Sequence, residues 1–149
     1  MGDKMAPPGK WPLKVLLVED ELVNRMLLAS ILSRLVTNIR QAGDGVEALA
    51  LVEEELPDVV ITDLSMPRLD GLGLLQALHS RNLHPKTIIL TAHNQTSEFD
   101  SIGAPEAPRV LFKPLRFGLL SQAIEQIADE LGKTQSAVSE KNEAEPPGP

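Results

Sequence analysis

The 149-residue chain contains no cysteine, which excludes disulfide bonds and thiolate metal sites and removes any need for an oxidising compartment. It also lacks an apolar run long enough to span a bilayer, and residues 1–10 contain no apolar signal-peptide core. We therefore expect a cytoplasmic protein without membrane contact. Positive charge is in deficit as well: a net charge of −7 argues against nucleic acid as a direct partner.

The hydrophobic content of 42% is sufficient for one domain with a real core. We predict this domain at residues 13–132. Residues 1–12 are rich in proline and glycine and are expected to form a disordered arm. Residues 133–149 are polar and end in Glu-Pro-Pro-Gly-Pro, so we expect a disordered tail there.

Short runs of buried-strand character alternate with segments whose apolar residues recur at helical spacing. Strands are expected at 13–18, 38–42, 58–63, 87–91 and 109–112, and helices at 22–35, 46–56, 72–78 and 117–131. The first helix is expected to turn one stripe inward, formed by Leu22, Met26, Leu27, Ile31 and Leu35. Residues 97–102 could form two helical turns. This alternation predicts an α/β fold, a doubly wound five-stranded parallel sheet, and its single tryptophan, Trp11, is expected to pack over the sheet edge.

Polar residues follow four of these strands at the point where each strand ends. They are Glu19 and Asp20, Asp63, Thr91, and Lys113. The carboxyl ends of parallel strands lie along one edge, which is where open α/β sheets bind ligands. With the common strand order 2-1-3-4-5, Asp20 and Asp63 would lie within a few ångströms of each other.

Carboxylates gathered in this way repel one another. Two unit charges about 4 Å apart interact by roughly 4 kcal/mol at an effective dielectric near 20. Lys113 supplies one offsetting charge, and Mg²⁺, which prefers oxygen ligands, is the natural second. A carboxylate nucleophile (Asp63), a metal, a hydroxyl (Thr91) and a lysine together make a phosphoryl-transfer site. Each piece alone has a plainer interpretation, because acids before a helix usually just favour its N-terminus.

The sequence resembles a response-regulator receiver domain from two-component signalling, of the stand-alone single-domain type, over about residues 13–131. The matching segments are Val15–Glu21, Ala42–Leu49, Asp58–Asp63, Met66–Gly71, Thr91–Ala92 and Phe112–Pro114. The resemblance implies the flavodoxin-like receiver fold with strand order 2-1-3-4-5. It also implies a phosphoryl group taken onto Asp63 from a phosphohistidine of a sensor histidine kinase or a phosphorelay protein.

The resemblance assigns further roles residue by residue. Asp20 resembles the direct Mg²⁺ ligand, with Glu19 acting through water and Ser65 offering its backbone carbonyl. Thr91 resembles the switch hydroxyl and Lys113 the lysine that pairs with the phosphoryl group. The Lys113–Pro114 bond is usually cis in the family. These roles imply a self-phosphorylating phosphoacceptor with Mg²⁺-dependent autodephosphorylation rather than a turnover enzyme.

Some positions depart from the family pattern. Val110 stands where an aromatic switch residue is usual, and Pro105 and Pro108 stand where the fourth helix usually ends. Ser65 and His93 occupy positions that tune the phosphoryl lifetime.

Because the tail after Leu131 is too short to fold, we expect output through contact with a downstream protein; the sequence leaves open whether the chain forms a homodimer. The main alternative is a non-phosphorylated scaffold of the same fold. An aspartate-nucleophile phosphatase is disfavoured because Ser65 replaces its general acid, and a flavodoxin-type carrier because an acidic crevice repels a flavin phosphate.

Overall fold

The computed structural model describes residues 9–64, 69–91 and 108–134. Their elements, in chain order, are β1 (Trp11–Val18), α1 (Leu22–Leu32), β2 (Val36–Ala42), α2 (Gly45–Glu54), β3 (Val59–Asp63), α3 (Gly71–Ser80), β4 (Lys86–Thr91), β5 (Arg109–Phe112) and α4 (Phe117–Glu130). The five strands form one sheet of order β2-β1-β3-β4-β5, and every neighbouring pair is parallel. This confirms the predicted fold class and strand order.

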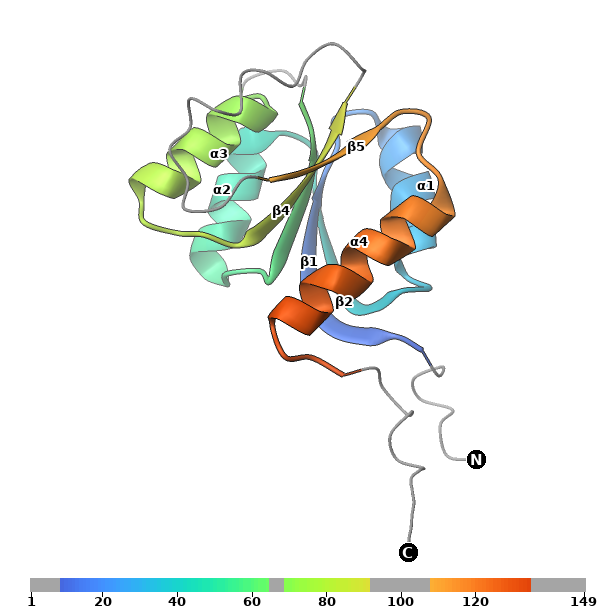
Figure 1. Ribbon diagram of the computed structural model, residues 1–149. Helices are drawn as coiled ribbons and strands as arrows, with labels where there is room; N and C mark the ends of the chain where they lie inside the picture. The colour runs from blue at the N-terminus through green and yellow to red at the C-terminus, as the bar shows by residue number, and fades with distance from the viewer. Residues whose placement is uncertain (1–8, 65–68, 92–107, 135–149) are drawn as a thin grey trace, which may run out of the picture.

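Helices cover both faces of the sheet (Figure 1). Helices α1 and α4 lie on one face, and α2 and α3 lie on the other. Alternate residues of the central strands point to opposite faces, so each face has its own core: Val59 and Ile61 pack on the α4 side, whereas Val60 packs on the α3 side. Burial on both faces is why the central strands read as continuous apolar runs.

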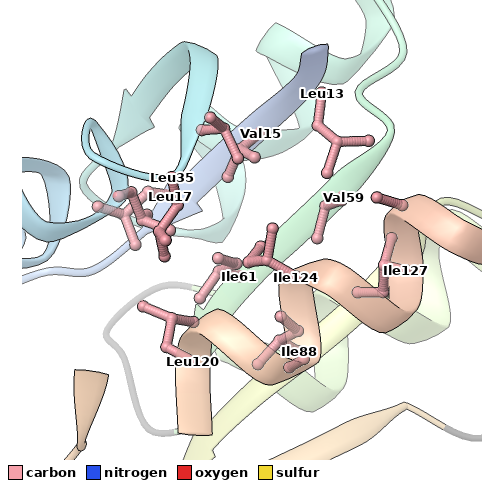
Figure 2. Close-up of a cluster of buried hydrophobic side chains, with 14 of the residues drawn as sticks. Leu13, Val15, Leu17, Leu35, Val59, Ile61, Ile88, Leu120, Ile124 and Ile127 are labelled. Carbon is pink, nitrogen blue, oxygen red and sulfur yellow. The ribbon is translucent and has the colours of Figure 1, made fainter. Parts of the chain in front are cut away.

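The core on the α4 side joins strands that are far apart in the sequence (Figure 2). Apolar side chains from β1, β3 and β4 face three residues spaced along α4, which are Leu120, Ile124 and Ile127. Because these three positions recur every three to four residues, they form one inward stripe of the helix. The helix predicted at 117–131 is thereby confirmed as α4.

Strand β1 begins earlier than predicted, so residues 11 and 12 do not belong to an irregular arm. The Trp11 backbone N–H donates to the Leu35 carbonyl at 2.7 Å, and Trp11 pairs with Val36 in the sheet. This pairing is available because α1 ends at Leu32 and β2 begins at Val36, whereas the predicted helix ran to Leu35 and the predicted strand began at residue 38. The Trp11 side chain packs, partly buried, against the α4-side core.

The predicted inward stripe of α1 was wrong in its first two turns. Leu22, Met26 and Leu27 are 57–59% exposed, and the helix instead turns Leu28, Ala29 and Leu32 toward the core. The sequence Leu-Val-Asn-Arg-Met-Leu-Leu-Ala-Ser-Ile-Leu is apolar on nearly every side, so its periodicity does not single out one face.

Strand β2 forms one edge of the sheet and carries an arginine that reaches the end of α2. Arg40 donates to the Leu51 carbonyl at 3.0 Å and to the Glu55 carbonyl at 2.6 Å. The last carbonyls of a helix lack some or all of their partners within it, and that of Leu51 accepts one further bond, from the Glu55 N–H at 3.1 Å. Arg40 therefore caps the C-terminal end of α2 from the neighbouring strand.

Several predictions lie outside the described residues. They concern the arm before Gly9, the two helical turns at 97–102, Pro105, the tail from residue 135, and Ser65 and His93. Among the helices that the structure describes, none is both long and apolar enough to cross a membrane.

Candidate phosphoacceptor and metal site

Asp63 lies at the carboxyl end of the central strand β3 and is 9% exposed. Gly71, the first residue of α3, lies close to its backbone. The Gly71 N–H donates to the Leu64 carbonyl at 2.9 Å, and a Cβ built on Gly71 would lie 2.4 Å from the Asp63 carbonyl oxygen. Only glycine permits this close approach. The start of α3 therefore packs directly against the backbone of Asp63.

Glu19 and Asp20 reach the same place from β1. Because Val18 pairs with Thr62, the residues that follow these two strands emerge at the same level of the sheet edge. One carboxylate oxygen from each of Glu19, Asp20 and Asp63 lies within 4.8 Å of the others. Glu19 is buried at 3% exposure, whereas Asp20 is exposed. The predicted convergence of these acids is confirmed.

Glu19 is the most deeply buried carboxyl of this cluster. Burial raises its pKa above the ordinary value, and the negative charge of Asp63 raises it further. The Glu21 backbone N–H donates to Glu19 Oε2 at 3.1 Å and acts in the opposite direction by stabilising the ionised form. The net result is a carboxylate that favours a cation beside it.

Lys113 supplies a cation directly at Asp63. Its Nζ donates to Asp63 Oδ2 at 2.7 Å, across fifty residues of sequence. The Lys113 backbone N–H donates to the Thr91 carbonyl at 2.9 Å, which fixes the lysine beside the end of β4, and the Lys113–Pro114 bond is cis. Burial alone would lower the pKa of Lys113, but the hydrogen bond and charge of Asp63, together with the charges of Glu19 and Asp20, raise it above its ordinary value.

Thr91 ends β4 and is 1% exposed. It pairs with Phe112, the residue before Lys113, so the ends of β4 and β5 lie side by side at the site edge. Val110 is partly buried against the α3-side core, which is consistent with a packing role. The predicted backbone ligand Ser65 lies outside the described residues.

The donor atoms suit a hard divalent cation. All three converging groups are carboxylates, and Mg²⁺ prefers a few carboxylate oxygens and retains waters for its other positions. Glu19, Asp20 and Asp63 are thus the residues that could hold Mg²⁺.

Two contacts at this edge were not predicted from the sequence. The Arg25 guanidinium donates to the Glu19 carbonyl at 2.8 Å, and Gly45 approaches Leu69 so closely that a Cβ would lie 2.3 Å from its carbonyl oxygen. The sequence carries no usable signal for Arg25, because the apolar residues of α1 do not single out the face that it shares with Leu28, Ala29 and Leu32.

Comparison with known proteins agrees with this site. The family described as response regulator receiver domain matches residues 15–125. A "Probable chemotaxis protein CheY" from Rhizobium etli is 35% identical over 118 residues, which cover 77% of this chain and 92% of the relative. The transcriptional regulatory protein PdtaR from Mycobacterium tuberculosis is 38% identical over 115 residues, but these cover 76% of this chain and 56% of that relative.

Solved structures give the same result. The N-terminal domain of an uncharacterized protein from Wolinella succinogenes has a TM-score of 0.72 and 32% identity, covering 80% of this chain and 98% of that one. The receiver domain of a Francisella response regulator has a TM-score of 0.69 and 27% identity, with the same coverage.

Proposed function

Because the chain belongs to the response regulator receiver domain family of two-component signalling, we propose that Asp63 accepts a phosphoryl group from a phosphohistidine. The donor would be a sensor histidine kinase or a phosphotransfer protein, and the phosphorylated form would signal through contact with a downstream protein. One observation carries the proposal. An aspartate at the tip of the central strand lies between a lysine amine, 2.7 Å away, and two further carboxylates.

Phosphoryl transfer would require a different contribution from each of three side chains. An Asp63 carboxylate oxygen attacks phosphorus, the P–N bond to the donor imidazole breaks, and the imidazole nitrogen keeps the electron pair. Lys113 pairs with the Asp63 carboxylate beforehand and would then hold a phosphoryl oxygen. The Thr91 hydroxyl would be drawn to another of these oxygens.

The metal would be held by Glu19, Asp20 and Asp63, with the Ser65 carbonyl as a further ligand. When bound, Mg²⁺ supplies positive charge that offsets the carboxylates and the incoming phosphoryl oxygens. Hydrolysis of the acyl phosphate at the same site would return the protein to its starting state. This is a self-modification with autodephosphorylation rather than turnover of a diffusible substrate.

The output of the domain is a separate part of the proposal. The two similar curated proteins are named for chemotaxis and for transcriptional regulation, so the family alone does not select an output. We propose that residues 11–132 act as a cytoplasmic receiver that works by protein–protein contact.

A small phosphodonor tests the function directly. Wild-type protein incubated with acetyl phosphate and Mg²⁺ is expected to gain one phosphoryl group by intact mass, and Asp63→Asn is expected to gain none because the nucleophilic carboxylate is gone. Asp58→Asn is the matched control, since Asp58 lies just before the opposite end of β3, where it accepts from the Lys14 N–H. Unmodified wild type would instead support the scaffold alternative, and undiminished labelling of Asp63→Asn would contradict the assignment of the nucleophile.

A further inference from the structure

Helix α1 presents its side chains in an unusual way close to the site. Of residues 21–27, Arg25 alone is half-buried, while the apolar side chains of Leu22, Val23, Met26 and Leu27 are 57–62% exposed. Burial of such apolar side chains normally stabilises a fold. The first two turns of α1 nevertheless point an arginine inward and leave these apolar groups outside.

Arg25 continues the inward stripe of α1 toward the site. Residues three, four and seven positions apart share one helix face, and Arg25 stands at these spacings from Leu28, Ala29 and Leu32. Those three residues pack into the α4-side core. At the N-terminal end of the same stripe, an arginine occupies the place that a packing residue would take.

The inward guanidinium contacts the peptide that joins the two metal-binding acids. Arg25 Nη1 donates to the Glu19 carbonyl at 2.8 Å, and this carbonyl belongs to the Glu19–Asp20 peptide bond. On its other side, Glu19 is held by its own N–H, which donates to the Ala42 carbonyl of β2 at 3.1 Å. Glu19 is thus held at both of its peptide groups, once by the sheet and once by Arg25.

The same guanidinium also lies against the turn after β2. A Cβ built on Gly43 would lie 3.2 Å from Arg25 Nη1 and 3.4 Å from Glu47 Oε1, and the Gly43 N–H donates to that glutamate oxygen at 2.7 Å. Arg25 therefore bridges two loops at the site edge, the one after β1 that carries the acids and the one after β2.

We propose that Arg25 is a positioning residue for the magnesium site: it fixes the Glu19–Asp20 peptide so that both carboxylates converge with Asp63. This role rests on the proposed function of the acidic cluster. It does not require the arginine to touch the metal or the phosphoryl group, and it explains why the inward stripe ends in a charged side chain.

The sign of the effect on Mg²⁺ affinity separates this role from simpler ones. A cation near three carboxylates repels a second cation, so if charge were its only effect, Arg25→Ala would bind Mg²⁺ more tightly. If Arg25 only stabilised the fold, the variant would unfold more easily and bind Mg²⁺ unchanged. Positioning alone predicts weaker binding, about tenfold for the loss of one hydrogen bond from a charged donor.

The experiment is titration calorimetry of Mg²⁺ into the unphosphorylated full chain, with thermal unfolding measured in parallel. We expect Arg25→Ala to bind about tenfold more weakly and Arg25→Lys, which keeps one donor, to recover part of the loss. Arg25→Met keeps the aliphatic stem if the alanine variant does not fold, and should bind as weakly as alanine. Arg34→Ala removes an equal charge just beyond the opposite end of α1, where Arg34 lies over the Phe117 ring, and should bind like wild type.

Suppose that wild type binds Mg²⁺ and takes up a phosphoryl group from acetyl phosphate. Unchanged or tighter Mg²⁺ binding by folded Arg25→Ala or Arg25→Met would then overturn the positioning role but leave the proposed function intact. A wild type that does neither would overturn the proposed function, and the role of Arg25 with it.

Discussion

At the scale of single residues, Glu19 is the most buried member of the acidic cluster, and its pKa lies above the ordinary glutamate value. Burial and the Asp63 charge both raise its pKa, so ionising Glu19 costs the folded state more than the unfolded chain. This cost is absent at a pH below the pKa of Glu19 in the unfolded chain. It appears as the pH rises through that value and is fully present above the pKa of Glu19 in the folded state. The proposed role of Glu19 in holding Mg²⁺ would explain why a residue that weakens the fold at neutral pH stands there.

We accordingly expect Glu19→Gln to be more stable than wild type at pH 7 in the absence of metal, because the amide carries no charge and can still accept from the Glu21 N–H. The advantage should disappear in acid, below the ordinary glutamate pKa near 4.5. Thermal unfolding with chelator at several pH values measures this difference. A gain that is the same at every pH would show that the charge of Glu19 is not its source.

At the scale of elements, strands were easier to predict than the facing of helices. The run Val59-Val60-Ile61 is buried on both faces of β3, so a continuous apolar pattern has one interpretation, and the predicted strand differed by one residue. The predicted inward face of α1 was wrong because apolar residues surround most of the helix. Tertiary contacts of Arg25 and Leu32 determine which face points inward. The convergence of Asp63 with Lys113 was predictable from strand ends, whereas the Arg25 contact was not, since a backbone carbonyl leaves no mark on the sequence.

The packing of α3 on Asp63 leads to a prediction about glycine. Gly71→Ala would place a methyl group 2.4 Å from the Asp63 carbonyl oxygen, closer than real Cβ contacts come. The backbone must move, and we expect a loss of about 1–3 kcal/mol in the free energy of unfolding together with weaker Mg²⁺ binding. Urea unfolding and calorimetry measure the two effects.

The matched control is Gly118→Ala in α4, where a Cβ would meet nothing within 4 Å among the described residues. It should leave Mg²⁺ binding unchanged. The free energy of unfolding should stay the same or rise by up to about 0.5 kcal/mol, because alanine has a higher helix propensity than glycine. Equal effects of the two substitutions would argue against a steric limit at Gly71.

At the scale of the whole molecule, one parallel sheet brings side chains from β1, β3 and β5 to a single edge, so events at that edge are linked to folding of the entire domain. A ligand that binds only the folded state stabilises it by RT ln(1 + [L]/Kd). Mg²⁺ bound by three strand-end acids should therefore raise the stability of every element together.

We expect the midpoint temperature of unfolding to rise with MgCl₂ concentration. The gain in the free energy of unfolding should reach ~2.7 kcal/mol when the Mg²⁺ concentration is a hundred times its dissociation constant. Asp20→Asn should reduce this shift, since one of the three converging carboxylates is lost. Potassium chloride at equal ionic strength controls for general screening. A shift that salt alone reproduces, or that survives in Asp20→Asn at full size, would mean that these acids do not form the site.

The contact between Arg40 of β2 and the end of α2 also affects self-association of the protein. A strand at the margin of a sheet offers its backbone as a template on which foreign strands can add, and charged side chains on such strands hinder this. Arg40 places a guanidinium on β2 and engages it with the Leu51 and Glu55 carbonyls, while β5, at the opposite margin, is only four residues long. Both margins thus discourage polymerisation through the addition of strands from other copies.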